Sequence, residues 1–106
     1  MISRLGFVLH PEAAQDVLEI WEYVANENLA AAGRLRQEIF ESIRNLVKFP
    51  YRGHTRIELT SNPVRFQIVR DYLIAYAPDE KPLTVLAVVH GRRSPRVIAA
   101  ILRSRE

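Results

Sequence analysis

The feature that most constrains this chain is the stretch from Leu83 to Pro95, where an apolar strand runs directly into a basic turn. Residues 83–89 are almost all apolar and include three valines, which favours a strand buried on both faces. The polar sequence His90-Gly91-Arg92-Arg93 follows, and Ser94-Pro95 then supplies a helix N-cap and a first helical residue. A buried strand, a basic corner and a helix start are therefore predicted within one short segment.

The composition is that of a small globular protein without thiol chemistry. The chain has 106 residues, 48% of them apolar, which suffices for one domain with a buried core. The absence of cysteine excludes a thiol nucleophile and any thiolate metal site. No apolar run approaches the roughly 20 residues of a membrane helix. We predict a single domain over residues 1–106, located in the cytoplasm, with no metal, no cofactor and no membrane contact.

Positive charge is concentrated in the second half of the chain. Residues 1–51 carry five Lys or Arg against seven acids, a net charge of −2, whereas residues 52–106 carry ten against five, a net charge of +5. Arginine supplies 13 of the 15 cations, and its planar guanidinium suits phosphate and carboxylate groups. The second half is therefore a candidate surface for an anionic partner, unless the arginines serve solubility alone.

Two amphipathic helices are predicted in the first half. Apolar side chains recur every three or four positions in residues 11–26, and Pro11-Glu12 suits a helix start. A second such stripe predicts a helix over residues 29–48 that stops at Phe49-Pro50. Because the break between them is short, we expect an antiparallel helical hairpin.

Strands and one more helix account for the rest. Short apolar or alternating runs at 5–9, 64–70, 72–77 and 83–89 predict strands, the last three as an antiparallel meander. Residues 50–63 are typical of a loop, with a short extended piece at 56–59. A helix over 94–106 is expected to carry Arg96, Arg103 and Arg105 on its outer side. The prediction is an α+β fold: an N-terminal strand, a two-helix antiparallel hairpin packed on an antiparallel β-sheet, and a short C-terminal helix.

Candidate functional residues cluster in the loop and at the basic corner. Arg52, His54 and Arg56 alternate, so an extended backbone would project them from one side. Arginine stays protonated, so only His54 or His90 could serve as a general base.

The basic corner also has a purely structural interpretation. Gly91 then only permits a tight backbone, and His90 is a satisfied histidine at the edge of the core. Arg92 then only pairs with Glu12 or Asp16 on a helix.

The order of these elements resembles the ParE/RelE superfamily of toxins from bacterial toxin–antitoxin pairs. The similarity covers nearly the whole chain and rests on motifs that occur in family order. They are Pro11-x-Ala13-x-x-Asp16-x-x-x-Ile20-x-x-Tyr23, then Ala31, Ala32 and Ile39, then Phe49-Pro50-x-x-Gly53 and Leu59, then Arg65, Tyr72-Leu73-Ile74-x-Tyr76 and Val89-His90-Gly91-Arg92-Arg93. The resemblance implies the toxin component of a type II toxin–antitoxin module.

Two mechanisms occur in that superfamily. RelE-like members resemble ribonucleases that cut messenger RNA on the ribosome, and the candidate catalytic residues for this chemistry are His54, Arg65, His90 and Arg92. ParE-like members are taken to poison DNA gyrase by binding, without catalytic residues. Here no tyrosine follows His90, and the loop after the second helix carries arginines instead of a lysine cluster. We therefore favour the ParE-like interpretation, with a ribonuclease or an inactive basic domain as alternatives.

The ParE-like interpretation implies two contact surfaces. Arg92, Arg93, Arg96 and Arg103 are expected to bind the target. An antitoxin with an acidic, partly disordered C-terminal segment is expected to fold on binding, with Arg65 and Arg70 meeting its carboxylates.

Overall fold

The structure is a computed structural model that describes residues 4–106, so residues 1–3 of the predicted domain lie outside the described part. The elements are β1 (Phe7–Leu9), α1 (Pro11–Ala25), α2 (Leu29–Lys48), β2 (His54–Thr55), β3 (Arg65–Val69), β4 (Tyr72–Ala77), β5 (Leu83–His90) and α3 (Pro95–Arg105). The predicted α+β fold is confirmed, and the three helices begin and end within a residue or two of their expected bounds.

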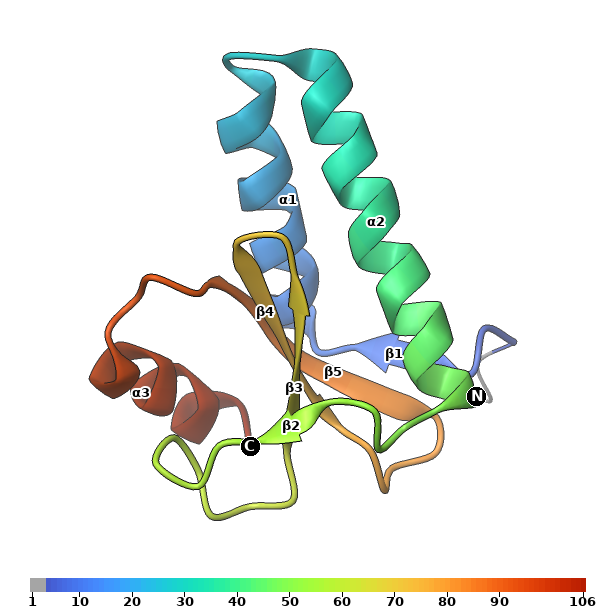
Figure 1. The fold of residues 1–106 in the computed structure, drawn as a ribbon, viewed down its shortest axis with the longest axis vertical. Helices are drawn as coiled ribbons and strands as arrows, with labels where there is room; N and C mark the ends of the chain where they lie inside the picture. Colours follow the sequence, from blue (N-terminus) through green and yellow to red (C-terminus); the bar gives the residue numbers. More distant parts are fainter. Residues whose placement is uncertain (1–3) are drawn as a thin grey trace.

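Helices cover the two faces of a central sheet (Figure 1). The α1–α2 hairpin packs on one face, where Ile39, Ile43 and Tyr76 belong to the larger apolar core. The α3 helix packs on the other face, where Ile98 and Leu102 join a second core. The apolar stripe of α3 is buried at Ile98 and Leu102, whereas Val97 on the same helix is 41% exposed.

The sheet is mixed, which corrects the expectation of an antiparallel sheet. Its order is β1-β5-β4-β3-β2, and β1 pairs with β5 in parallel. The helical hairpin and the strands β2, β3 and β4 lie between β1 and β5 in sequence, so no short turn dictates the relative direction of β1 and β5. The predicted antiparallel meander of β3, β4 and β5 is confirmed.

The loop after α2 differs from its predicted form. The extended piece is β2, which pairs with β3, whereas residues 56–59 form a turn in which Leu59 N and Thr60 N both donate to Arg56 O. Burial of Leu59 in the second core explains the turn, because a strand there would carry that side chain away from the sheet.

Each helix begins at a side chain that accepts a hydrogen bond from the first turn. Asn28 Oδ1 accepts from Ala31 N at 2.9 Å, and Ser94 Oγ accepts from Val97 N at 3.3 Å. His10 Nδ1 does the same for Glu12 N at 3.1 Å, ahead of Pro11. These contacts satisfy N–H groups that have no partner within the helix.

Candidate functional site

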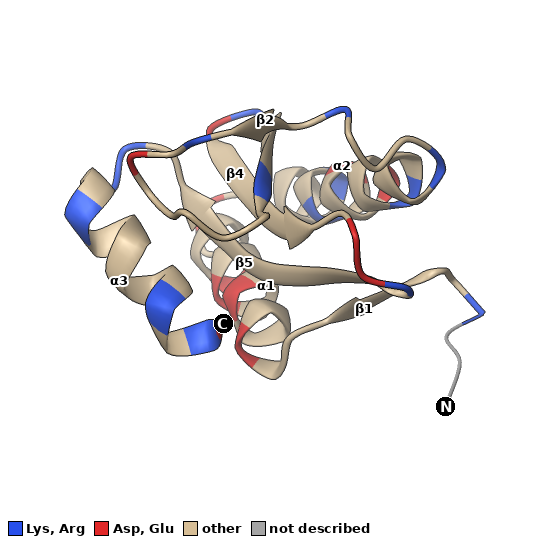
Figure 2. Ribbon diagram, turned by 90° about the horizontal axis from the view of Figure 1, so that it is seen from below, with Lys and Arg blue, Asp and Glu red and all other residues tan. Residues whose placement is uncertain are grey.

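The four arginines expected to bind the target are exposed around the N-terminal end and outer side of α3. Within residues 4–106, no group forms a hydrogen bond or ion pair with the side chains of Arg92, Arg93, Arg96 or Arg103. Figure 2 shows blue positions along α3 and at the turn that precedes it. This surface therefore presents cationic groups that no internal carboxylate neutralises.

His90 and Gly91 fix the shape of the corner. His90 Nδ1 accepts a hydrogen bond from Arg92 N at 3.0 Å, and His90 O accepts from Arg93 N at 3.1 Å. The His90 ring contacts Tyr72 edge-on, with centroids 5.2 Å apart. Gly91 N donates to Asp71 O at 2.7 Å, and a Cβ on Gly91 would lie 3.3 Å from that oxygen. The histidine thus orients the two arginines through the backbone.

Of the four candidate ribonuclease residues, Arg92 lies beside His90, to which its N donates, but His54, Arg65 and His90 do not come together in this fold. Arg65 is paired with Tyr76 and His90 with Tyr72, so they lie four residues apart along β4, about 13 Å. His54 is paired with Phe66, whose side chain belongs to the core under α3, whereas Arg65 lies on the hairpin face. One phosphate could not contact His54, Arg65 and His90 at once.

The Arg65 side chain is hydrogen-bonded to the loop between α2 and β2. Its Nη1 donates to Gly53 O at 2.7 Å and to Tyr51 O at 3.2 Å, and its guanidinium lies 5.3 Å from the centre of the Tyr51 ring. The Tyr76 hydroxyl secures the same loop, donating to Pro50 O at 2.7 Å and accepting from Gly53 N at 2.9 Å. The geometry gives Arg65 a structural role that the sequence did not indicate.

Replacing Arg65 with alanine is expected to lower the free energy of unfolding by about 2 kcal/mol, because two loop carbonyls lose a charged donor. Urea denaturation followed by circular dichroism measures the change. The control is Arg52→Ala in the same loop, because the exposed Arg52 side chain makes no hydrogen bond or ion pair within residues 4–106. This variant should change the free energy of unfolding by less than about 0.5 kcal/mol. Equal effects of the two variants would contradict the role assigned to Arg65.

Arg70 ties the β3–β4 turn to α2. Its φ of 52° lies in the left-handed region, and its Nε and Nη2 donate to the two Glu38 carboxylate oxygens at 2.9 and 2.8 Å. The hydrogen bond from Arg70 lowers the pKa of Glu38 below its ordinary value. The Arg70 and Glu38 side chains are 62% and 37% exposed, so solvent screens the pair.

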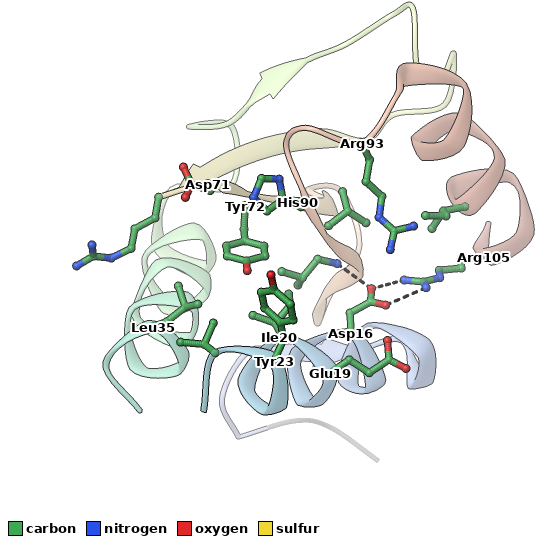
Figure 3. Close-up of a pocket in the computed structure, with 15 residues that line it drawn as sticks. Asp16, Glu19, Ile20, Tyr23, Leu35, Asp71, Tyr72, His90, Arg93 and Arg105 are labelled. Atoms are coloured by element: carbon green, nitrogen blue, oxygen red, sulfur yellow. Dashed lines mark hydrogen bonds and ion pairs between the residues drawn. The ribbon is translucent and has the colours of Figure 1, made fainter. Parts of the chain in front are cut away.

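A groove of about 770 Å³ lies between α1, the end of β5 and α3 (Figure 3). Its lining includes Glu19, Tyr23, Arg70, Tyr72, His90 and Arg93. Tyr23 is 75% exposed and points toward Tyr72 across the groove, while burial and the nearby Asp71 charge raise the pKa of Tyr72. The sequence pattern did not mark Tyr23 or Tyr72 as site residues. Both stand in the family-like motifs, and Tyr23 lies on the polar side of its helix, which were the signals that pointed to them.

The partner of Asp16 is Arg105, which corrects two expectations. Arg105 was expected on the outer side of the helix, but its side chain is only 10% exposed and pairs with Asp16 and, at 3.6 Å, with Glu12. The structural interpretation of the corner assigned those acids to Arg92, whose side chain is unpaired among the described residues. The hydrogen bond with Asp16 raises the pKa of Arg105.

Between residues 4 and 106, no three His, Asp or Glu side chains gather into a group able to hold a metal ion. None of the helices in that range combines the length and apolar character that crossing a membrane requires.

Comparison with known proteins completes the description. A family model described as the ParE toxin of the type II toxin–antitoxin system parDE matches residues 7–95. A search of curated proteins returned no match. Because the family match runs from β1 through the basic corner, the chain belongs to the ParE toxins of type II toxin–antitoxin systems, a membership that implies a cognate antitoxin as its partner.

Proposed function

We propose that this toxin arrests growth in the cytoplasm by binding DNA gyrase through Arg92, Arg93, Arg96 and Arg103, without catalysing a reaction itself. The observation that carries the proposal is that four exposed guanidinium groups, unpaired among the described residues, gather around the start and outer side of one helix, α3. A surface of free arginines suits an acidic protein face or a phosphate backbone.

The distribution of histidines supports binding over catalysis. Cleavage of RNA needs a base near the 2′-hydroxyl and cations around the same phosphate. His54 and Arg65 lie on different faces of the sheet, and the Nδ1 of His90 already accepts a hydrogen bond from Arg92 N. A ribonuclease would therefore have to assemble its site from residues that this fold separates.

The groove beside the corner is the proposed seat of the antitoxin. Arg70 and Arg93 line it together with the apolar side chains of Ile20, Val24 and Ile101, a mixture that suits an acidic amphipathic segment. Arg70 keeps its proposed role of meeting antitoxin carboxylates through Nη1, because Glu38 accepts only from its Nε and Nη2. Arg65 was expected to share that role, but its guanidinium donates to loop carbonyls instead.

Two assays on the purified protein separate the mechanisms. We expect inhibition of gyrase-catalysed supercoiling that is relieved by the antitoxin, and no ribosome-dependent cleavage of messenger RNA. Cleavage that disappears in His90→Ala or His54→Ala would replace the proposal with the ribonuclease alternative. An inactive basic domain would be indicated if expression is harmless and neither assay responds.

A further inference from the structure

The strand β5 has a free edge where β1 ends. β1 pairs only with Leu83, Thr84 and Val85, and His10 N closes that ladder by donating to Val85 O. Among residues 4–106, no strand lies on this side of β5 from Leu86 onward. A free edge of this kind leaves backbone N–H and C=O groups that need other partners.

Two side chains from opposite ends of the chain occupy this edge. Asp16 Oδ2, from α1, accepts a hydrogen bond from Val88 N at 3.0 Å, and Arg105 Nη1, from the last turn of α3, donates to Leu86 O at 3.1 Å. The two side chains also bind each other, with Nη1 2.5 Å from Oδ2 and Nη2 3.1 Å from Oδ1 (Figure 3). Together they supply the acceptor and the donor that a neighbouring strand would supply.

The pair is well shielded from solvent. The Asp16 and Arg105 side chains are 14% and 10% exposed. Hydrogen bonds between ionised groups are stronger in such surroundings, and removing one partner leaves an uncompensated charge. In Figure 2, acidic positions of α1 lie beside the C-terminal end of α3.

We propose that Asp16 and Arg105 form a latch that caps the free edge of β5 and holds the C-terminal half of α3 in place. The turn at residues 91–94 fixes the start of α3 and Leu102 packs in the second core, while the latch supplies the polar contacts that hold the last turn. At that end Glu106 also accepts hydrogen bonds from the Thr60 and Asn62 side chains, and Arg105 Nε lies 3.6 Å from Glu12 Oε2. Asp16 and Arg105 thereby act as positioning residues for Arg96 and Arg103, a consequence that rests on the proposed function.

Amide hydrogen exchange of the free protein tests the latch without reference to any target. In Arg105→Gln, the amides of residues 98–105 are expected to exchange about tenfold faster, while those of α2 change less than about twofold, because the opening is local. Arg103→Gln, on the same helix but unpaired within the described residues, is the control and should leave both regions unchanged. An equal rise in α3 and α2, or no rise in α3, would overturn the proposal.

Exchanging the charges of Asp16 and Arg105 distinguishes capping of the β5 edge from electrostatic attraction between the two side chains. Asp16→Arg combined with Arg105→Asp restores opposite charges but places a donor at Val88 N–H and an acceptor at Leu86 C=O. We expect α3 to exchange as fast as in Arg105→Gln, whereas Arg105→Lys should restore part of the protection because a donor returns to Leu86 O. Full protection in the exchanged protein would overturn edge capping. Since none of these measurements involves gyrase, they stand or fall separately from the proposed function.

Discussion

Replacing Gly53 with alanine is expected to destabilise the domain by about 3 kcal/mol, the largest effect we expect from a single methyl group. A Cβ on Gly53 would lie 2.5 Å from the Tyr76 hydroxyl oxygen and 2.8 Å from Phe66 O. Tyr76 is fully buried, so its ring has no open direction in which to move. The loop must shift, which breaks the Tyr76 and Arg65 hydrogen bonds described above.

Chemical denaturation provides the measurement, and Gly33 provides the matched control. Gly33 lies within α2, where an added Cβ meets nothing within 4 Å. Gly33→Ala should therefore stabilise the protein by about 0.5–1 kcal/mol, through the lower chain entropy of alanine. If the two substitutions changed stability equally, the close packing at Gly53 would not be what sets its cost.

A double-mutant cycle assigns the source of the strain. In a Tyr76→Phe background the shortest clash at Gly53 disappears, although the contacts with Phe66 O at 2.8 Å and with ring atom Cε1 of residue 76 at 2.9 Å remain. Gly53→Ala should then cost about 1 kcal/mol less than in the parent protein. Strict additivity would show that the hydroxyl contact does not limit the site.

Replacing Arg92 and Arg93 together with alanine is expected to abolish growth arrest while leaving the fold intact. Both side chains are exposed and unpaired among residues 4–106, so the unfolding free energy should change by less than about 0.5 kcal/mol. The backbone groups that shape the corner, Arg92 N and Arg93 N, keep their bonds to His90. Colony counts after induction and the urea midpoint of the purified variant give the two readouts.

The control for charge is Arg34→Ala with Arg44→Ala on α2, which removes the same two positive charges from exposed positions away from the corner. This variant should still arrest growth. If it is as harmless as the corner variant, net charge and not location explains toxicity. If the corner variant instead unfolds at a markedly lower urea concentration, those arginines serve the fold.

Local patterns predicted the elements because they follow from residues close together in the chain. Helix starts and ends were predictable because they depend on neighbouring backbone groups. The starts are marked by Ser94-Pro95 and by the polar break before Leu29, and the end of α2 is marked by Phe49-Pro50. Alternation in β3 and the short turn at Asp71 gave the meander. The 3.6-residue stripes of α1 and α2 likewise indicated the hairpin before any contact was known.

Contacts between distant residues were decided by the tertiary structure. Asp16 and Arg105 are separated by 89 residues, and nothing in the sequence distinguishes Arg105 from Arg103 as the partner of that acid. The orientation of α3 on the sheet directs the Arg105 side chain to the β5 edge and leaves the Arg103 side chain exposed to solvent. The strand register similarly directs Arg65 to the loop carbonyls, whereas the sequence had made it a candidate for catalysis and antitoxin binding.

The sequence by itself therefore determined the helices, the strands other than β2, the fold class and the basic character of the corner, because periodicity, caps and composition act locally. The tertiary structure decided which arginines remain free and which are bound internally. A guanidinium is held only where carboxylate or carbonyl oxygens converge on it in the correct geometry, and that convergence is created when the α1–α2 hairpin and α3 close on the two faces of the sheet.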